Sequence, residues 1–187
     1  MNHPEIPLDA GLYLVSTPIG NARDITLRAL DVLASARLIA AEDTRTARKL
    51  MEIHGLETRG RHMMAYHDHS GPGARDRVIG AIADGQAVAY VSEAGTPLLA
   101  DPGFQLARAV RVAGQSVWAV PGASALLAAL AVAGLPTDRF HFAGFLPNAQ
   151  VARRAALSDL RDQHGTVVLY ESPKRLAALV ADIAATL

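Results

Sequence analysis

The feature that most constrains the fold is a regular alternation of short apolar runs with longer segments of helical spacing. Five apolar runs lie in the first 120 residues, at 12–16, 38–41, 63–66, 87–91 and 116–120. Strands that are apolar throughout are buried on both faces of a sheet, and helical crossovers connect parallel neighbours. The sequence therefore predicts an α/β fold with a mostly parallel five-stranded sheet and flanking helices.

The helices between these runs have recognisable ends. Asp24 is the expected N-cap of the first helix, and Asp101 followed by Pro102 is expected to begin the helix that ends near Ala113. Two further helices are expected, at 44–54, closed by Gly55, and at 74–83, closed by Asp84-Gly85.

A second unit is expected after Val120, where Pro121-Gly122 marks a hinge. The expected elements are helices at 124–133, 150–163 and 173–186 and strands at 141–145 and 166–171. The predicted domains are therefore 1–120 and 121–187. Two strands make a poor sheet, so the second domain is expected to be incomplete.

Composition excludes several classes of protein. Lys+Arg and Asp+Glu are equal at 18 each, so no global charge draws the chain to nucleic acid or membrane. The absence of cysteine excludes disulfides and cysteine catalysis and fits a cytoplasmic protein. The uncharged stretch 115–137 is broken by Pro121-Gly122 and closed by Gly134 and Pro136, so a buried strand–turn–helix is expected there and not a membrane span.

Unusual residues gather where the predicted strands end. In open α/β sheets, ligands bind beyond the carboxyl ends of the strands. The segments that leave these ends are TPIGNARD, EDTR, HDHSGPG, SEAGTPLLADPG and PGASA. No G-x-G-x-x-G follows the first strand, and no P-loop or G-x-S-x-G motif is present, so dinucleotide, nucleotide and serine-hydrolase sites are not expected.

Three of these segments have a functional and a purely structural interpretation. Glu42, Asp43 and Arg45 form either a helix cap with a salt bridge or a catalytic cluster. His67, Asp68 and His69, with His62 and Glu42, could bind metal, contact substrate or make loop hydrogen bonds. The small residues of 92–97 and 121–125 are either tight turns or a surface for a flat ligand contacted by backbone.

Several long motifs, in order, carry a resemblance to a known family. They are LYLVSTPIGN, LIAAEDTR, YHDHS, VSEAGTPLLADPG, PGASA, GLPTDRFHFAGFLP and LYESPKRL. With them the chain, from Gly11 to Leu187, closely resembles the ribosomal RNA small-subunit methyltransferase I family. That family belongs to the tetrapyrrole-methylase superfamily of class III S-adenosylmethionine (SAM) methyltransferases.

The resemblance implies methyl transfer from SAM to the ribose 2′-hydroxyl of a cytidine in the decoding region of 16S rRNA, in the 30S subunit. It also implies two α/β domains with SAM in the cleft between them, a homodimer, and no metal. Family members are normally longer, so the chain resembles a C-terminally truncated member.

The resemblance also implies site residues. The expected cofactor-binding residues are Pro18, Ser92, Ala94, Gly95, Thr96, Leu99, Ser124, Ala125, Leu146 and Tyr170. The expected catalytic residues are Glu42, Asp43, Arg45, His67 and His69, with Glu42 or Asp43 favoured as the group that accepts the hydroxyl proton. The expected RNA-binding residues are Arg23, Arg48, Lys49, Arg153, Arg154 and Arg175, with Arg153-Arg154 the strongest pair.

Two alternatives remain open. One is a small-molecule SAM methyltransferase of the same superfamily that acts on a tetrapyrrole precursor. Its first loop would be richer in Gly than TPIGN, and its pocket more apolar than Glu42, Arg45, His67 and His69 allow. The other is an inactive fragment or binding protein of the rRNA enzyme's fold.

Overall fold

The structure is a computed structural model that describes residues 3–67, 70–99 and 103–187. The chain forms two compact units, one ending at Ala125 and the other running from Leu126 to Leu187. Among the described residues, no helix is both long enough and apolar enough to span a membrane.

The first unit is built on a five-stranded sheet in the order β3-β2-β4-β1-β5. Every neighbouring pair of strands in it is parallel. The strands are β1 (Gly11–Val15), β2 (Leu38–Ala41), β3 (His62–Ala65), β4 (Ala87–Val91) and β5 (Val117–Val120). The central strand β4 is buried at every position, which explains its continuous apolar sequence AVAYV. The predicted five-stranded sheet is confirmed.

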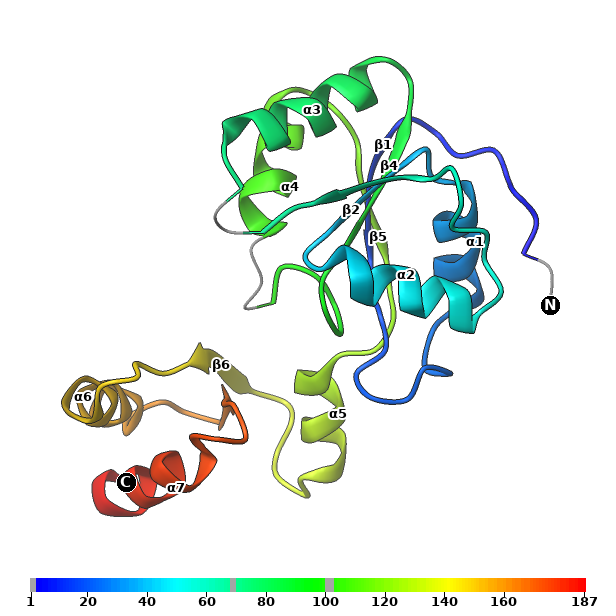
Figure 1. The fold of residues 1–187 in the computed structure, drawn as a ribbon. Helices are drawn as coiled ribbons and strands as arrows, with labels where there is room; N and C mark the ends of the chain where they lie inside the picture. The colour runs from blue at the N-terminus through cyan, green and yellow to red at the C-terminus, as the bar shows by residue number, and fades with distance from the viewer. Residues whose placement is uncertain (1–2, 68–69, 100–102) are drawn as a thin grey trace. The chain divides into compact units, whose positions relative to one another are not determined.

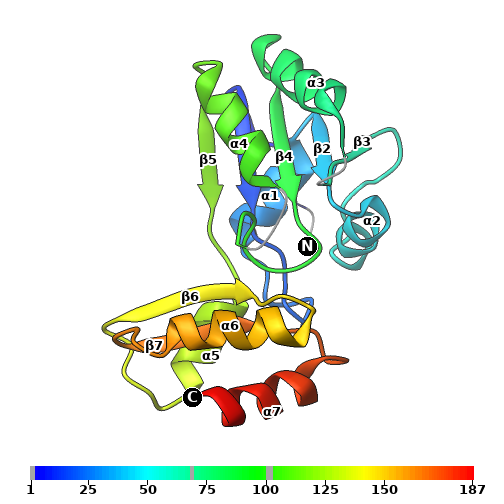
Figure 2. The same cartoon turned by 90° about the vertical axis from the view of Figure 1, so that its left-hand side faces the viewer.

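Helices cover both faces of this sheet (Figure 1). They are α1 (Leu27–Ser35), α2 (Thr44–Ile53), α3 (Pro72–Ala83) and α4 (Gly103–Val112). Side chains of α1 and α2 pack with Val15, Ile39 and Val91 on one face. Those of α3 and α4 pack with Leu12, Val88 and Tyr90 on the other. Because all five strands run the same way, their carboxyl ends meet at one edge (Figure 2).

The second unit contains a two-stranded parallel sheet and two helices that pack on one another (Figure 2). Its elements are β6 (Phe140–Phe145), α6 (Gln150–Leu160), β7 (Thr166–Tyr170) and α7 (Leu176–Thr186), preceded by α5 (Ala125–Val132). A small core of Leu146, Leu157 and Leu179 joins the sheet to α6 and α7.

Two local predictions are corrected. The N-cap of α1 is Thr26 and not Asp24, because the Thr26 hydroxyl accepts the Ala29 N–H at 3.1 Å. The first unit extends beyond Val120, because the carbonyl of Ala123 accepts a hydrogen bond from Thr96 and Gly122 packs against Ser16. The predicted cap at Asp101-Pro102 lies outside the described residues.

Candidate active site

The loops after β1 and β4 are joined by main-chain hydrogen bonds. The Thr17 N–H donates to the Gly95 carbonyl at 2.9 Å, and the Gly95 N–H returns a bond to Thr17 at 3.1 Å. Gly95 has a φ of 81°, which side-chain-bearing residues rarely adopt, and a Cβ there would meet the Ile19 side chain at 3.3 Å. The glycine therefore lets the fourth loop lie against the first.

The loop after β5 joins the same assembly through hydroxyl groups. Ser16 Oγ donates to Thr96 Oγ1 at 3.2 Å, and Thr96 Oγ1 donates to the Ala123 carbonyl at 3.0 Å. At Gly122 a Cβ would lie 2.8 Å from Ser16 Cβ, so this close approach requires glycine. Three loops that are distant in the sequence thus form one cradle, which we define as residues 16–18, 92–97 and 121–125.

The cradle contains buried hydroxyl groups that the described part of the chain leaves without a partner. They belong to Thr17, Ser92 and Ser124, which are 3%, 8% and 8% exposed. Buried polar groups normally make hydrogen bonds, and leaving one unpaired costs about 1–3 kcal/mol. Three such groups at the carboxyl edge of one sheet indicate a site built for a polar ligand.

The loop after β2 supplies the acidic groups. Glu42 Oε2 accepts the Glu93 N–H at 3.1 Å, so Glu42 is tied to the cradle's fourth loop. Asp43 is the N-cap of α2 and accepts hydrogen bonds from the Arg45 N–H at 2.8 Å and from the Arg45 guanidinium at 3.2 and 2.8 Å. These bonds hold the pKa of Asp43 at about 2, and those from the Arg45 side chain contribute more than the one from its backbone N–H. Asp43 is consequently a poor proton acceptor.

Of the two histidines predicted to be catalytic, His67 is described; His62, the third candidate of the histidine cluster, is exposed and begins β3. His67 is exposed, and its N–H donates to Ser70 Oγ at 2.9 Å. His69 lies outside the described residues. In the described ranges, no group of three or more His, Asp or Glu side chains could hold a metal ion.

The remaining predicted cofactor residues have varied surroundings. In the first unit, Pro18 is half-buried, Ala94 is exposed, Leu99 is 36% exposed, and Ala125 begins α5. In the second unit, Leu146 is 7% exposed and directly follows β6. Tyr170 Oη, at the end of β7, accepts the Leu126 N–H of α5 at 3.0 Å.

The predicted RNA-binding residues divide into two groups. Arg23, Arg48 and Lys49 are exposed. Arg153 is only 5% exposed, with its guanidinium paired to Asp182, which contradicts its expected place on an open RNA-binding surface. Arg154 also pairs with Asp182, and Arg175 pairs with Glu171. The sequence could not show this, because the partners lie 28 or more residues away for Arg153 and Arg154.

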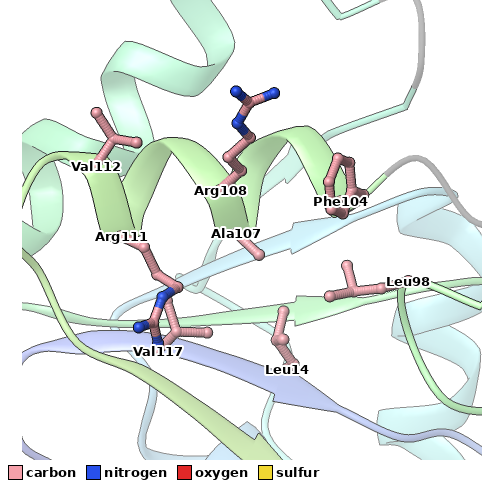
Figure 3. Close-up of a pocket in the computed structure, with 8 residues that line it drawn as sticks. All are labelled: Leu14, Leu98, Phe104, Ala107, Arg108, Arg111, Val112 and Val117. Atoms are coloured by element: carbon pink, nitrogen blue, oxygen red, sulfur yellow. The ribbon is translucent and has the colours of Figure 1, made fainter.

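A separate apolar pocket of about 510 Å³ lies between α4 and the sheet (Figure 3). Leu14, Val117, Ala107 and Phe104 line it, together with Leu98 from the loop after β4. Leu98 has a φ of 73°, the one side-chain-bearing residue in the described ranges with a left-handed backbone. The described residues that line the pocket include no acid and no hydroxyl, so we place no chemistry in it.

Three cradle residues are absent from the predicted site residues. Ser16 is the last residue of the predicted strand 12–16, Thr17 begins the predicted loop segment TPIGNARD, and Gly122 belongs to the predicted small-residue surface 121–125 without a role of its own. The signal that could have found them is that all three lie at carboxyl ends of strands, where ligands bind in open sheets.

Comparisons with known proteins agree with this architecture. Residues 11–187 match the family model described as Tetrapyrrole (Corrin/Porphyrin) Methylases. A solved structure of cobalt precorrin-4 methyltransferase, a cobalamin biosynthetic enzyme, superposes with a TM-score of 0.67 at 16% identity, covering 94% of this chain and 74% of that one. The fold is therefore the same, and the chain belongs to the tetrapyrrole methylases.

Relatives found by sequence share a more specific name than the family model. A protein of Mesorhizobium japonicum named "Ribosomal RNA small subunit methyltransferase I" is 48% identical over 93% of this chain and 58% of its own length. A protein of Micromonospora olivasterospora with the same name is 44% identical over 94% of this chain and 55% of its own length. The resemblance predicted from the motifs is confirmed. The chain spans less than two thirds of the length of these relatives.

Proposed function

We propose that the protein is a SAM-dependent methyltransferase that methylates the ribose 2′-hydroxyl of a cytidine in the decoding region of 16S rRNA, within the 30S subunit. Relatives at 44–48% identity carry the corresponding name. The observation that carries the proposal is the set of buried hydroxyls of Thr17, Ser92 and Ser124, which have no partner among the described residues and lie beside the acidic loop after β2.

The cradle fits the polar parts of SAM. SAM has an amino acid group and a ribose, which together offer donors and acceptors to the hydroxyls of Thr17, Ser92 and Ser124. Gly95 and Ala94 have no bulky side chain, so they leave space for SAM beside the main chain. Leu99 adds an apolar contact. Thr96 acts by holding the three loops together. When bound, SAM supplies a methyl group on a positively charged sulfur.

Glu42 is the residue we assign to accept the proton of the ribose hydroxyl. A weak oxygen nucleophile gains roughly 10²–10⁴-fold from a positioned proton acceptor. Asp43 is disfavoured as the proton acceptor because Arg45 holds its pKa at about 2. Its proposed role is to cap α2 and to orient Arg45. Glu42 is oriented by the Glu93 N–H, which fixes its carboxylate at the cradle.

Basic side chains of the first unit are proposed to contact rRNA phosphates. Arg45 projects from the start of α2, with its side chain 88% exposed, and Arg48, Lys49 and Arg23 are also exposed. Arginine and lysine contacts to phosphate position an RNA without reading its sequence. With a ribosomal substrate, the reaction takes place in the cytoplasm. A homodimer is proposed from the family resemblance.

The test is methyl transfer from SAM carrying a tritiated methyl group to purified 30S subunits. We expect label in 16S rRNA, recovered after nuclease digestion as 2′-O-methylcytidine. Label in a base, or in an added tetrapyrrole precursor and not in rRNA, would contradict the proposal. A protein with Glu42→Gln serves as the control for background transfer.

A further inference from the structure

The segment that follows β6, Leu146–Asn148, has two of its main-chain carbonyls held by arginines. Arg175 Nη2 donates to the Leu146 carbonyl at 3.2 Å, and Arg153 Nη1 donates to the Asn148 carbonyl at 2.9 Å. We call Leu146–Asn148 the β6 loop. It leads directly into α6, whose N-cap Ala149 makes no side-chain capping bond. The arginines therefore restrain the loop through its carbonyl groups, whereas a side-chain cap would have accepted hydrogen bonds from the first N–H groups of the helix.

Each of these arginines is itself fixed by a buried carboxylate. Arg153 Nε donates to Asp182 Oδ2 at 2.8 Å, and the Asp182 side chain is 1% exposed. Arg175 Nε donates to Glu171 Oε1 at 2.7 Å, and the Glu171 side chain is 3% exposed. The planar guanidinium can bind a carboxylate along one edge and a carbonyl with a remaining N–H, which an ammonium group cannot reproduce.

Because the N–H groups of Arg153 are already used inside the protein, they are not available to bind RNA phosphates. Arg153 donates three of its N–H directions within its own unit and is 5% exposed. Arg154 is different: its side chain is 47% exposed, and its Nε donates to the other oxygen of Asp182 without reaching the β6 loop. The two neighbours on α6 thus share one carboxylate but only Arg153 contacts the loop.

We propose that Arg153 and Arg175 are positioning residues that hold the β6 loop in its binding shape through the Asn148 and Leu146 carbonyls. The loop carries Leu146, a residue proposed to contact SAM, so the functional part of this inference rests on the proposed function. The role differs from the RNA contact expected from the sequence. Asp182 and Glu171 are the carboxylates that orient the two arginines.

The test compares Arg153→Lys and Arg175→Lys with Arg154→Lys as the matched control. Each variant keeps the positive charge, so the electrostatic attraction to RNA is preserved. The planar guanidinium, which binds a carboxylate and a carbonyl at the same time, is lost. Amide hydrogen exchange of the segment 145–150 reports the loop without any ligand. We expect exchange there to rise about tenfold or more in the first two variants and to stay within about twofold in the control, as local opening becomes easier.

Kinetics with 30S subunits give the second readout. We expect the KM for SAM to rise about 5- to 20-fold in Arg153→Lys and Arg175→Lys, with kcat at saturating SAM within about threefold, because a disordered loop must be reordered on binding. Unchanged loop exchange in both variants, or a weaker 30S affinity with an unchanged KM for SAM, would overturn the inference. If one variant does not fold, the other decides. Failure of the unmodified protein to bind SAM would refute the proposed function and this loop's part in it, whereas hydrogen exchange would still decide the positioning role.

Discussion

Thr96 donates its hydroxyl hydrogen to the Ala123 carbonyl at 3.0 Å, and so connects the loop after β4 to the loop after β5. The same oxygen accepts a hydrogen bond from Ser16 at 3.2 Å. A single small side chain therefore holds three loops at the carboxyl edge of the sheet. The geometry explains why the stretch SEAGTP follows a buried strand: it forms part of a cradle and does not simply reverse the chain.

The unpaired hydroxyls of the cradle give the first prediction. We expect Ser92→Ala, Ser124→Ala and Thr17→Val to leave the ligand-free protein as stable as before or slightly more stable, because each removes a buried group that has no partner in the described ranges. The same changes should weaken SAM binding by about 0.5–1.5 kcal/mol each, or roughly 2- to 13-fold, because a hydrogen bond to the ligand is lost.

Urea unfolding and SAM titration together check this prediction. Structural hydroxyls would give the opposite pattern, with lower stability and unchanged SAM affinity. Ser158→Ala, at an exposed position of α6, is the matched control and should change neither quantity.

The acidic loop gives the second prediction. Glu42→Gln should lower kcat about 10²–10⁴-fold with SAM affinity unchanged, because the proton acceptor is lost. Asp43→Asn should lower kcat far less, since a carboxylate with a pKa of about 2 accepts protons poorly and Asn also caps helices well. Single-turnover methyl transfer at saturating SAM measures both variants. A greater loss in Asp43→Asn than in Glu42→Gln would reverse the assignment.

Asp182 gives a prediction about pH. Hydrogen bonds, first from Arg154 and then from Gln150 and Arg153, outweigh its burial and hold its pKa at about 2, below the ordinary 3.8. A lowered folded-state pKa stabilises the fold above the unfolded-state pKa, and this contribution is lost as the pH falls from about 4 toward 2. Asp182→Asn should therefore be less stable than the unmodified protein at pH 6, and the difference should shrink toward pH 2.

The pH dependence is measured as the urea midpoint of each protein between pH 2 and 6. Asp159→Asn, at an exposed position on α6, is the control and should keep the slope of the unmodified protein. A constant difference between Asp182→Asn and the unmodified protein over the whole range would show that the carboxylate charge does not stabilise the fold.

The exposed bases of α2 give a prediction about RNA binding. Replacing Arg48 and Lys49 by Gln should weaken 30S binding and reduce the slope of log affinity against log salt by about 1 for each phosphate contact removed. Arg108→Gln on α4, equally exposed, should leave the slope unchanged. Filter binding over a range of salt concentrations measures the slopes, and equal slopes in all three proteins would remove α2 from the proposed RNA-binding surface.

The sequence predicts the sheet well because each strand has a strong local signal. The runs at 38–41 and 87–91 coincide with β2 and β4, since buried parallel strands are apolar at every position. The position of Glu42 and Ser92 at strand ends follows from the same pattern. The ends of α1 were less predictable, because both Asp24 and Thr26 are good caps and only the tertiary contacts of Thr26 separate them.

The pairs of Arg153 and Arg154 with Asp182 could not be predicted, because they depend on contacts between distant segments. Nothing local distinguishes Arg153 from Arg154, yet one is buried against Asp182 and the other is half-exposed. The unpaired hydroxyl of Thr17 is similarly invisible in the sequence, since pairing is a property of the folded cradle.

The most direct test of the account is calorimetric titration of SAM into the 187-residue chain and its Thr96→Arg variant. Thr137→Arg, at an exposed position, is the matched control. We predict that the unmodified chain and Thr137→Arg bind SAM equally, and that Thr96→Arg does not bind it, because a long charged side chain separates the loops that Thr96 joins. Equal binding by all three proteins, or binding by none, would contradict the assignment of the cradle as the SAM site.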